Sequence, residues 1–138
     1  MALHADLRDG LKTRIETIAG IRVYDTFPES PQVPCAIIMP DLPLNERVSI
    51  GVFRSSYLIT MLLQLGRYTG AQDTLDGHVS TTGSSDLLGA IEADRSLGGK
   101  ATTLMVREWG DYGSMVLSSA GRDIEYLGAK LRVDIYHD

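Results

Sequence analysis

The chain has 138 residues, of which 43% are apolar and 22% charged, values that fit one folded domain over residues 1–138 and argue against disorder. Its net charge of −5 argues against a protein that grips nucleic acid through the phosphates, because such a protein needs a basic surface. No run approaches roughly 18 apolar residues, and no basic stretch leads into an apolar one at the N-terminus, so we expect neither a membrane span nor a secretion signal.

The first predicted element is an amphipathic helix over residues 2–19. Gly20 is a natural C-terminal stop for this helix. Gly10 lowers the helix propensity of its middle, so we expect Gly10 to mark close packing. The apolar residues recur at steps of four, four, four and three, which makes one helical face of Leu3, Leu7, Leu11, Ile15 and Ile18.

Two short strands are predicted next. Residues 21–25 are rich in β-forming residues, and residues 35–39 are apolar on both faces and end at Pro40, which predicts a buried strand. Cys35 lies in this second strand, where we expect it to be a small core residue. Because it is the one cysteine of the chain, it cannot form an internal disulfide, which suits a reducing compartment.

Residues 41–56 predict an exposed hairpin arm rather than a core strand. The segment alternates weakly, with Val48, Ile50 and Val52 on one side, but Gly51 and two arginines make a poor core strand. A two-stranded ribbon is marginal alone in water, so an arm of this kind needs a partner; the alternative is an unstructured loop. We therefore predict an interface with a partner such as another subunit, formed by Arg47, Val48, Ile50, Val52, Phe53 and Arg54.

Residues 57–65 are the strongest predicted strand, which we expect at the centre of the sheet. The even positions of this strand mix apolar and polar residues. The odd positions are all apolar: Tyr57, Ile59, Met61, Leu63 and Leu65.

Two helical segments follow, over residues 71–79 and 85–95. Ser84 or Ser85 is the expected N-cap of the second segment. The buried side is expected to consist of Leu75, Leu87, Leu88 and Ile91. The acidic residues suit no calcium loop, so we interpret them as a solvated helix face: Asp73, Asp76, Asp86, Glu92 and Asp94.

The last third of the chain predicts two strands, over residues 102–109 and 124–136. Between them, residues 110–119 are interpreted as a glycine-bearing connection whose apolar stretch, residues 115–117, could add to the sheet. The element order is then α-β-β-β-α-β-β. This order predicts an α+β fold with a mostly antiparallel sheet, in which the N-terminal helix and the second helical region pack on one face.

No motif in the sequence predicts catalysis, a cofactor or a metal, so we expect no enzyme. His4, His78 and His137 have no metal-ligand spacing and are interpreted as surface residues. The segment Gly98-Gly99-Lys100 is not a phosphate loop, because Asp94 stands where the first glycine belongs and alanine follows the lysine. The segment 110–113 lacks the third glycine of a dinucleotide fingerprint.

Six segments follow one another in a distinctive order along nearly the whole chain. They are Ala19-Gly20-Ile21-Arg22-Val23-Tyr24, Pro34-Cys-Ala-Ile-Ile-Met-Pro40, Asp73-Thr-Leu75, Gly83-Ser-Ser85, Asp94-Arg-Ser-Leu97-Gly98-Gly99 and a final long strand with Glu125-Tyr126. The stop after the second helical region, residues 94–99, is the most distinctive of them. In their order and spacing these segments resemble the tail-terminator proteins of long-tailed, siphovirus-type phages.

The resemblance implies a structural virion protein of the tail and neck, which assembles in the host cytoplasm. Copies of such a protein form a ring, expected to be a hexamer, at the head-proximal end of the tail tube. The ring ends tube growth and offers a docking surface to the head–tail connector or stopper protein, and DNA passes through its lumen without specific binding.

The uneven charge of the chain agrees with such a lumen. Residues 1–69 hold seven Lys and Arg and seven Asp and Glu, whereas residues 70–138 hold six and eleven. We expect the acidic second half to line the lumen, because clustered negative charge repels a polyanion. Two other functions stay open: another neck protein, such as a head-completion or stopper subunit, and a small-molecule-binding α+β domain of the host cytosol.

Overall fold

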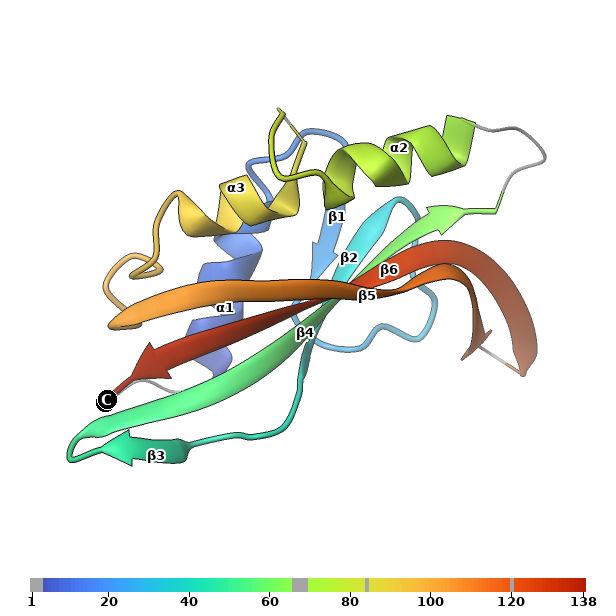
Figure 1. Cartoon of the computed structure of the whole chain (residues 1–138). Coiled ribbons are helices and arrows are strands. Elements are labelled where there is room, and N and C mark those ends of the chain that lie inside the picture. The colour runs from blue at the N-terminus through green and yellow to red at the C-terminus, as the bar shows by residue number, and fades with distance from the viewer. Residues whose placement is uncertain (1–3, 66–69, 84, 120) are drawn as a thin grey trace.

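Figure 1 shows the computed structural model of the chain, which describes residues 4–65, 70–83, 85–119 and 121–138. The elements in chain order are α1 (His4–Ile15), β1 (Arg22–Tyr24), β2 (Cys35–Pro40), β3 (Glu46–Ser49), β4 (Val52–Gln64), α2 (Gly70–Val79), α3 (Leu87–Glu92), β5 (Thr103–Ser119) and β6 (Arg122–His137). The predicted α+β fold, with an N-terminal helix and a second helical region before the last two strands, is confirmed.

The described strands form one six-stranded sheet in the order β1-β2-β4-β6-β5, and β3 pairs with β4 beside β2. Only the β1–β2 pair is parallel among them, so the sheet is mostly antiparallel, as predicted. The central position of the strand predicted over residues 57–65 is also confirmed. This strand begins earlier, at Val52, and pairs with β6 from Phe53 to Gln64.

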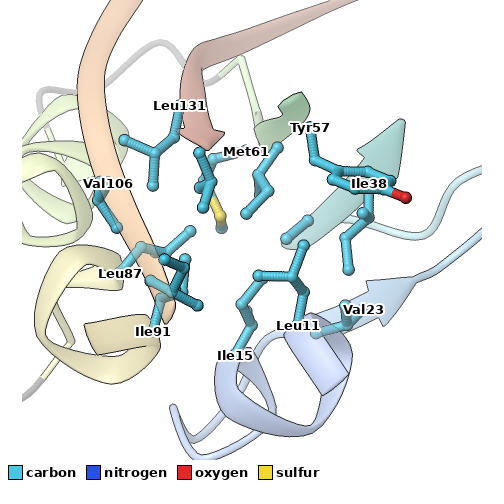
Figure 2. Packing of buried hydrophobic residues seen from close by; sticks show 14 of the residues in the cluster. Leu11, Ile15, Val23, Ile38, Tyr57, Met61, Leu87, Ile91, Val106 and Leu131 are labelled. Carbon is cyan, nitrogen blue, oxygen red and sulfur yellow. The ribbon is translucent and has the colours of Figure 1, made fainter. Parts of the chain in front are cut away.

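One face of the sheet forms the main core with the three helices. Figure 2 shows Leu11 and Ile15 of α1 and Leu87 and Ile91 of α3 pointing toward Met61 on the central strand. Tyr57, Ile59, Met61 and Leu63 lie in this core, as the alternation predicts, whereas Leu65 lies beyond the strand and is exposed.

Close packing at Gly10 is confirmed. An added Cβ at Gly10 would lie 2.8 Å from the Cβ of Leu97, so only glycine lets this side chain approach α1. Leu97 is buried with a positive φ of 51°. The Asp94 carboxylate fixes the turn around it by accepting hydrogen bonds from the Ser96 hydroxyl at 2.8 Å and from the N–H groups of Gly98 and Ser96 at 2.9 and 3.2 Å. These bonds, the one from the Ser96 hydroxyl above all, lower the pKa of Asp94.

The helix ends differ from the predictions. α1 ends at Ile15, although Ile18 beyond it stays in the core, and α3 ends at Glu92 rather than at residue 95. The N-cap of α3 is Asp86, whose carboxylate accepts the N–H of Gly89 at 2.9 Å. The prediction of Ser85 as the N-cap is therefore wrong, and the alternative, Ser84, lies outside the described residues.

The connection predicted over residues 110–119 is wrong as a separate loop, because these residues continue β5, whereas the expected addition of residues 115–117 to the sheet is confirmed. The register of β5 against β6 shifts between Val106 and Glu108 and again between Gly110 and Gly113. The glycines therefore mark irregularities within one long strand rather than a loop between elements.

At Gly128, which faces Gly113 in the β5–β6 register, β6 approaches β4 closely. An added Cβ at Gly128 would lie 2.5 Å from the carbonyl oxygen of Met61 and 3.2 Å from the sulfur of Met115. Beyond this point the paired ends of β5 and β6 curve away from the three helices (Figure 1).

This curved end packs on a second, smaller core on the other face of the sheet. Its buried residues are Cys35, Ile37, Leu62 and Tyr126, and Met115 and Leu117 of β5 pack against them. The prediction that Cys35 is a core residue is thereby confirmed, and burial raises the pKa of its thiol to about 11.

Replacing Gly128 by alanine is expected to destabilise the protein by about 1 to 3 kcal/mol, because the new Cβ meets backbone of β4 that cannot move aside. Gly110→Ala is the matched control, since a Cβ there meets nothing within 4 Å. Urea unfolding measures both variants. Equal stability of the two would mean that the close approach at Gly128 does not constrain the sheet.

The raised pKa of Cys35 predicts a loss of stability in alkali. The unfolded thiol, with a pKa of 9.0, ionises before the folded one, so stability is complete below pH 9 and falls as the pH rises through about 11. The fall is about 2 to 3 kcal/mol at 1.36 kcal/mol per pKa unit. Cys35→Ala should flatten the pH dependence that begins near pH 9, measured by urea unfolding at each pH; an unchanged curve would contradict this origin.

Candidate assembly surface

The described residues hold no group of three or more His, Cys, Asp or Glu side chains placed to bind a metal. None of the helices in that part of the chain combines the length and the hydropathy that crossing a bilayer requires. A hollow of about 450 Å³ lies between the end of β4 and α2. Two of its polar side chains already bind backbone carbonyls, Thr74 that of Gly70 and His78 that of Ser85, both at 2.8 Å.

The interpretation of the histidines as surface residues is wrong for two of them. His78 and His137 are only 5% and 3% exposed, and His4 is half-buried. Their spacing carries no signal, because His4 and His137 come together only when α1 packs beside the end of β6, with ring centroids 5.9 Å apart. All three histidines form hydrogen bonds with other groups of the chain.

His4 and His137 belong to a chain of hydrogen bonds at the base of the predicted arm. In the tautomer that satisfies both of its partners, His4 accepts the Tyr57 hydroxyl at Nδ1 and donates its Nε2–H to the Asn45 side-chain oxygen at 3.0 Å. The Asn45 backbone N–H donates to Oγ of Ser55 at 2.9 Å, and the Ser55 hydroxyl donates to Nε2 of His137 at 2.8 Å. These bonds join α1, the arm and the last strand, and burial raises the pKa of Tyr57 to about 12.

A second polar group holds the arm from the other face of the sheet. Asp134 is buried and accepts the Ser56 hydroxyl at 2.6 Å, while the guanidinium groups of Arg107 and Arg132 lie within 3.6 and 3.7 Å of its carboxylate. Arg132 also donates to the backbone carbonyl of Leu42 at 3.4 Å. The loop that enters the arm is therefore tied to the central strands on both faces.

A hairpin is present where the sequence predicts one, but its far strand is not separate from the sheet. β3 pairs with the start of β4, and Gly51, with a φ of 76°, makes the turn between them. Residues 52–56 belong to β4, and from Phe53 onward they pair on their other side with β6. The expected alternation of Val48, Ile50 and Val52 on one side is wrong, because a register shift follows Arg47 and the turn separates Ile50 from Val52.

The six predicted interface residues divide into two groups. Arg47, Val48 and Ile50 are exposed at the tip, and the Ile50 side chain is 89% exposed. The other three are half-buried and engaged within the chain. Phe53 stacks on His137 with ring centroids 6.2 Å apart, and Arg54 pairs with Glu46 across the hairpin. Only the first group is open to a partner; it is called the arm tip below.

The acidic residues are not one solvated face. Asp73 and Asp76 are exposed on α2, whereas Asp86 is the buried N-cap of α3. The Glu92 carboxylate accepts the backbone N–H of Val106 on β5 at 3.2 Å. Three of the five residues, Asp94 included, therefore hold turns and strand edges in place.

Sequence reasoning missed a second projecting hairpin, at the opposite end of the sheet from the arm. Beyond the last β4–β6 pair, Gln64 with Tyr126, the ends of β5 and β6 pair only with each other among the described strands. Residues 114–119 and 121–126 are called the ribbon below. The sequence does carry a signal for this strand pairing, because Met115 and Leu117 alternate with Ser114, Val116 and Ser118, as the residues of a strand do.

Neither a protein-family model nor a curated protein sequence matches this chain. The assignment of a function therefore depends on the sequence features described above and on the geometry of the arm tip and the ribbon.

Ser55→Ala is expected to lower stability by about 1 to 3 kcal/mol, because the Asn45 N–H and the buried His137 ring both lose their partner. The amide of Asn45 should then exchange faster with solvent, which hydrogen exchange measures. Ser114→Ala, at an exposed position of the ribbon, is the control. If both variants matched the parent protein, the hydrogen bonds at the arm base would contribute nothing to its anchoring.

Proposed function

We propose that this chain is a tail terminator, a structural virion protein whose copies form a ring at the head-proximal end of a phage tail tube. The ring, a hexamer in this proposal, ends growth of the tube and presents a docking surface to the head–tail connector. The observation that carries the proposal is the arm tip, an exposed apolar hairpin end on a rigidly anchored base.

The exposure of the arm tip supports the proposal that a partner binds there. Ile50 is almost wholly exposed and Val48 is 46% exposed, and Leu42 and Leu44 add exposed apolar surface to the loop that leads into β3. Burying such side chains contributes about 25 cal/mol per Å² of apolar surface removed from water, so contact with a neighbouring subunit or with the tube protein would stabilise the arm.

The anchoring of the arm supports an assembly role over a loose loop. Its far strand is the central strand of the sheet, and its near end is held by Ser55 and Arg132. The arm is therefore already ordered, and little conformational entropy is lost when a partner binds it.

The charge distribution supports a lumen that DNA crosses without binding. A ring of six copies would carry roughly −30, and acidic residues such as Asp73 and Glu108 are exposed in the second half of the chain. Arg54 is paired with Glu46, and Arg67 lies outside the described residues. A lumen lined mainly by Arg47, Arg54 and Arg67 would contradict the proposal.

Another neck protein, such as a head-completion or stopper subunit, would use the same kind of exposed arm and differs in what it caps. A small-molecule-binding domain would need a hollow with converging polar groups. The hollow beside α2 does not favour it, because Thr74 and His78 already bind backbone carbonyls there.

The double substitution Val48→Asp with Ile50→Asp tests the proposed role of the arm tip. Both positions are exposed, so we expect a folded chain with an unchanged circular dichroism spectrum that no longer forms rings or caps purified tail tubes. Light scattering after size exclusion measures the rings, and electron microscopy of tube lengths measures capping.

The control adds the same charge elsewhere: Thr81→Asp with Thr82→Asp, in the exposed loop after α2, should assemble like the parent chain. If the arm variant still formed rings and capped tubes normally, the arm tip would have no role in assembly. Loss of folding would show instead that the arm tip belongs to the core.

A further inference from the structure

The ribbon carries an exposed apolar residue beside acidic ones on its outer face. Side chains alternate along it, so that Met115, Leu117 and Tyr126 pack into the smaller core, and the pairs Val116 with Glu125 and Ser118 with Asp123 lie on the opposite, outer face. Val116 is 61% exposed and stands opposite Glu125 in the register, and Asp123 stands one outward position further along β6. This outer face is called the acidic ribbon face.

The arm tip has the complementary character. Glu46 and Arg54 of the hairpin pair with each other. The remaining charge is that of Arg47, which is exposed beside Val48 and Ile50. Within the described residues, neither Arg47 nor Glu125 has an ion-pair partner, while Asp123 accepts only the Ser118 hydroxyl, at 2.6 Å. One molecule thus carries two complementary surfaces, a basic apolar tip and an acidic apolar face.

The two surfaces cannot meet within one chain. They lie at opposite ends of the sheet, separated by the length of β4 (Figure 1). A strand of 13 residues spans about 40 Å at roughly 3.3 Å per residue. Contact between them must join two copies, and because the two surfaces differ, the contact is head-to-tail, which generates rings when the rotation closes.

The outer edge of β5 offers a less suitable route for joining copies. Strand addition needs free backbone groups in regular register, but Glu92 occupies the N–H of Val106, and the two register shifts interrupt the edge as far as Gly113. Side-chain docking at the ribbon needs no free edge.

We infer that the arm tip of one copy docks on the acidic ribbon face of the next, with Ile50 against Val116 and Arg47 against Glu125 and Asp123. This inference rests on the proposed ring and names the contact that builds it.

Cysteine pairs test the contact in a Cys35→Ala background, with purified tail tubes present and mild oxidation followed by non-reducing electrophoresis. The chain carrying both Ile50→Cys and Val116→Cys should give a ladder that ends at the ring size. A mixture of the two single variants should give dimers and nothing larger. The pair Ile50→Cys with Thr81→Cys, at an exposed site away from the ribbon, is the control and should stay monomeric.

The outcomes separate the contact from the ring. Dimers from Ile50→Cys alone would indicate a two-fold tip-to-tip contact, and equal cross-linking of the control pair would indicate random collision; either overturns the inference. Rings that assemble without the Ile50–Val116 cross-link overturn this contact and leave the proposed function standing. Absence of rings from the parent chain on tubes overturns the proposed function itself.

A charge exchange provides a second readout. Arg47→Glu and Glu125→Arg should each weaken self-association by roughly tenfold, and the variant with both changes should recover most of that loss. Sedimentation over a concentration series measures it. Equal weakening by the double variant would mean that the two charges do not face each other.

Discussion

The pairing of β4 with β6 is the constraint on which the rest of the structure depends. The pair runs in continuous register from Phe53 to Gln64 and gives both faces of the sheet their central residues. Its odd side supplies Tyr57, Ile59 and Met61 to the core beneath the helices. Its even side supplies Leu62 to the smaller core. A slip of one residue would exchange the two faces, so this register fixes where every other element packs.

Each projecting hairpin is an extension of this central pair. The arm arises because β4 begins five residues before Tyr57, where β3 rather than β2 is its neighbour. The ribbon arises because β6 begins before Tyr126, where β4 has already ended. Gly128, beside the ribbon, lets β6 approach Met61, and Met115 and Leu117 hold the ribbon against the smaller core. A rigid centre thus positions two surfaces that its own chain cannot bring together.

The polar groups near the arm show why buried histidines need not indicate chemistry. His4 and His137 meet near Tyr57, an arrangement of residue types that a catalytic site also uses. Their ring nitrogens are occupied by Tyr57, Asn45, Ser55 and the carbonyl of Asp138. Buried polar atoms that already have partners stabilise the fold, because leaving any of them unpaired would cost about 1 to 3 kcal/mol.

The sequence by itself determined the fold class, the central strand, the closeness at Gly10 and the presence of a hairpin after Pro40, because hydrophobic periodicity and turn residues act locally. It did not reveal that residues 110–119 continue a strand, since glycines in a register shift look like a loop until the partner strand is known. It also missed the burial of His137 and the cap at Asp86, which depend on contacts with residues distant in sequence or on where a helix begins. Only the tertiary structure decided that Phe53 and Arg54 are engaged within the chain while Arg47, Val48 and Ile50 are not, because exposure is a property of the packed sheet and not of the residue type.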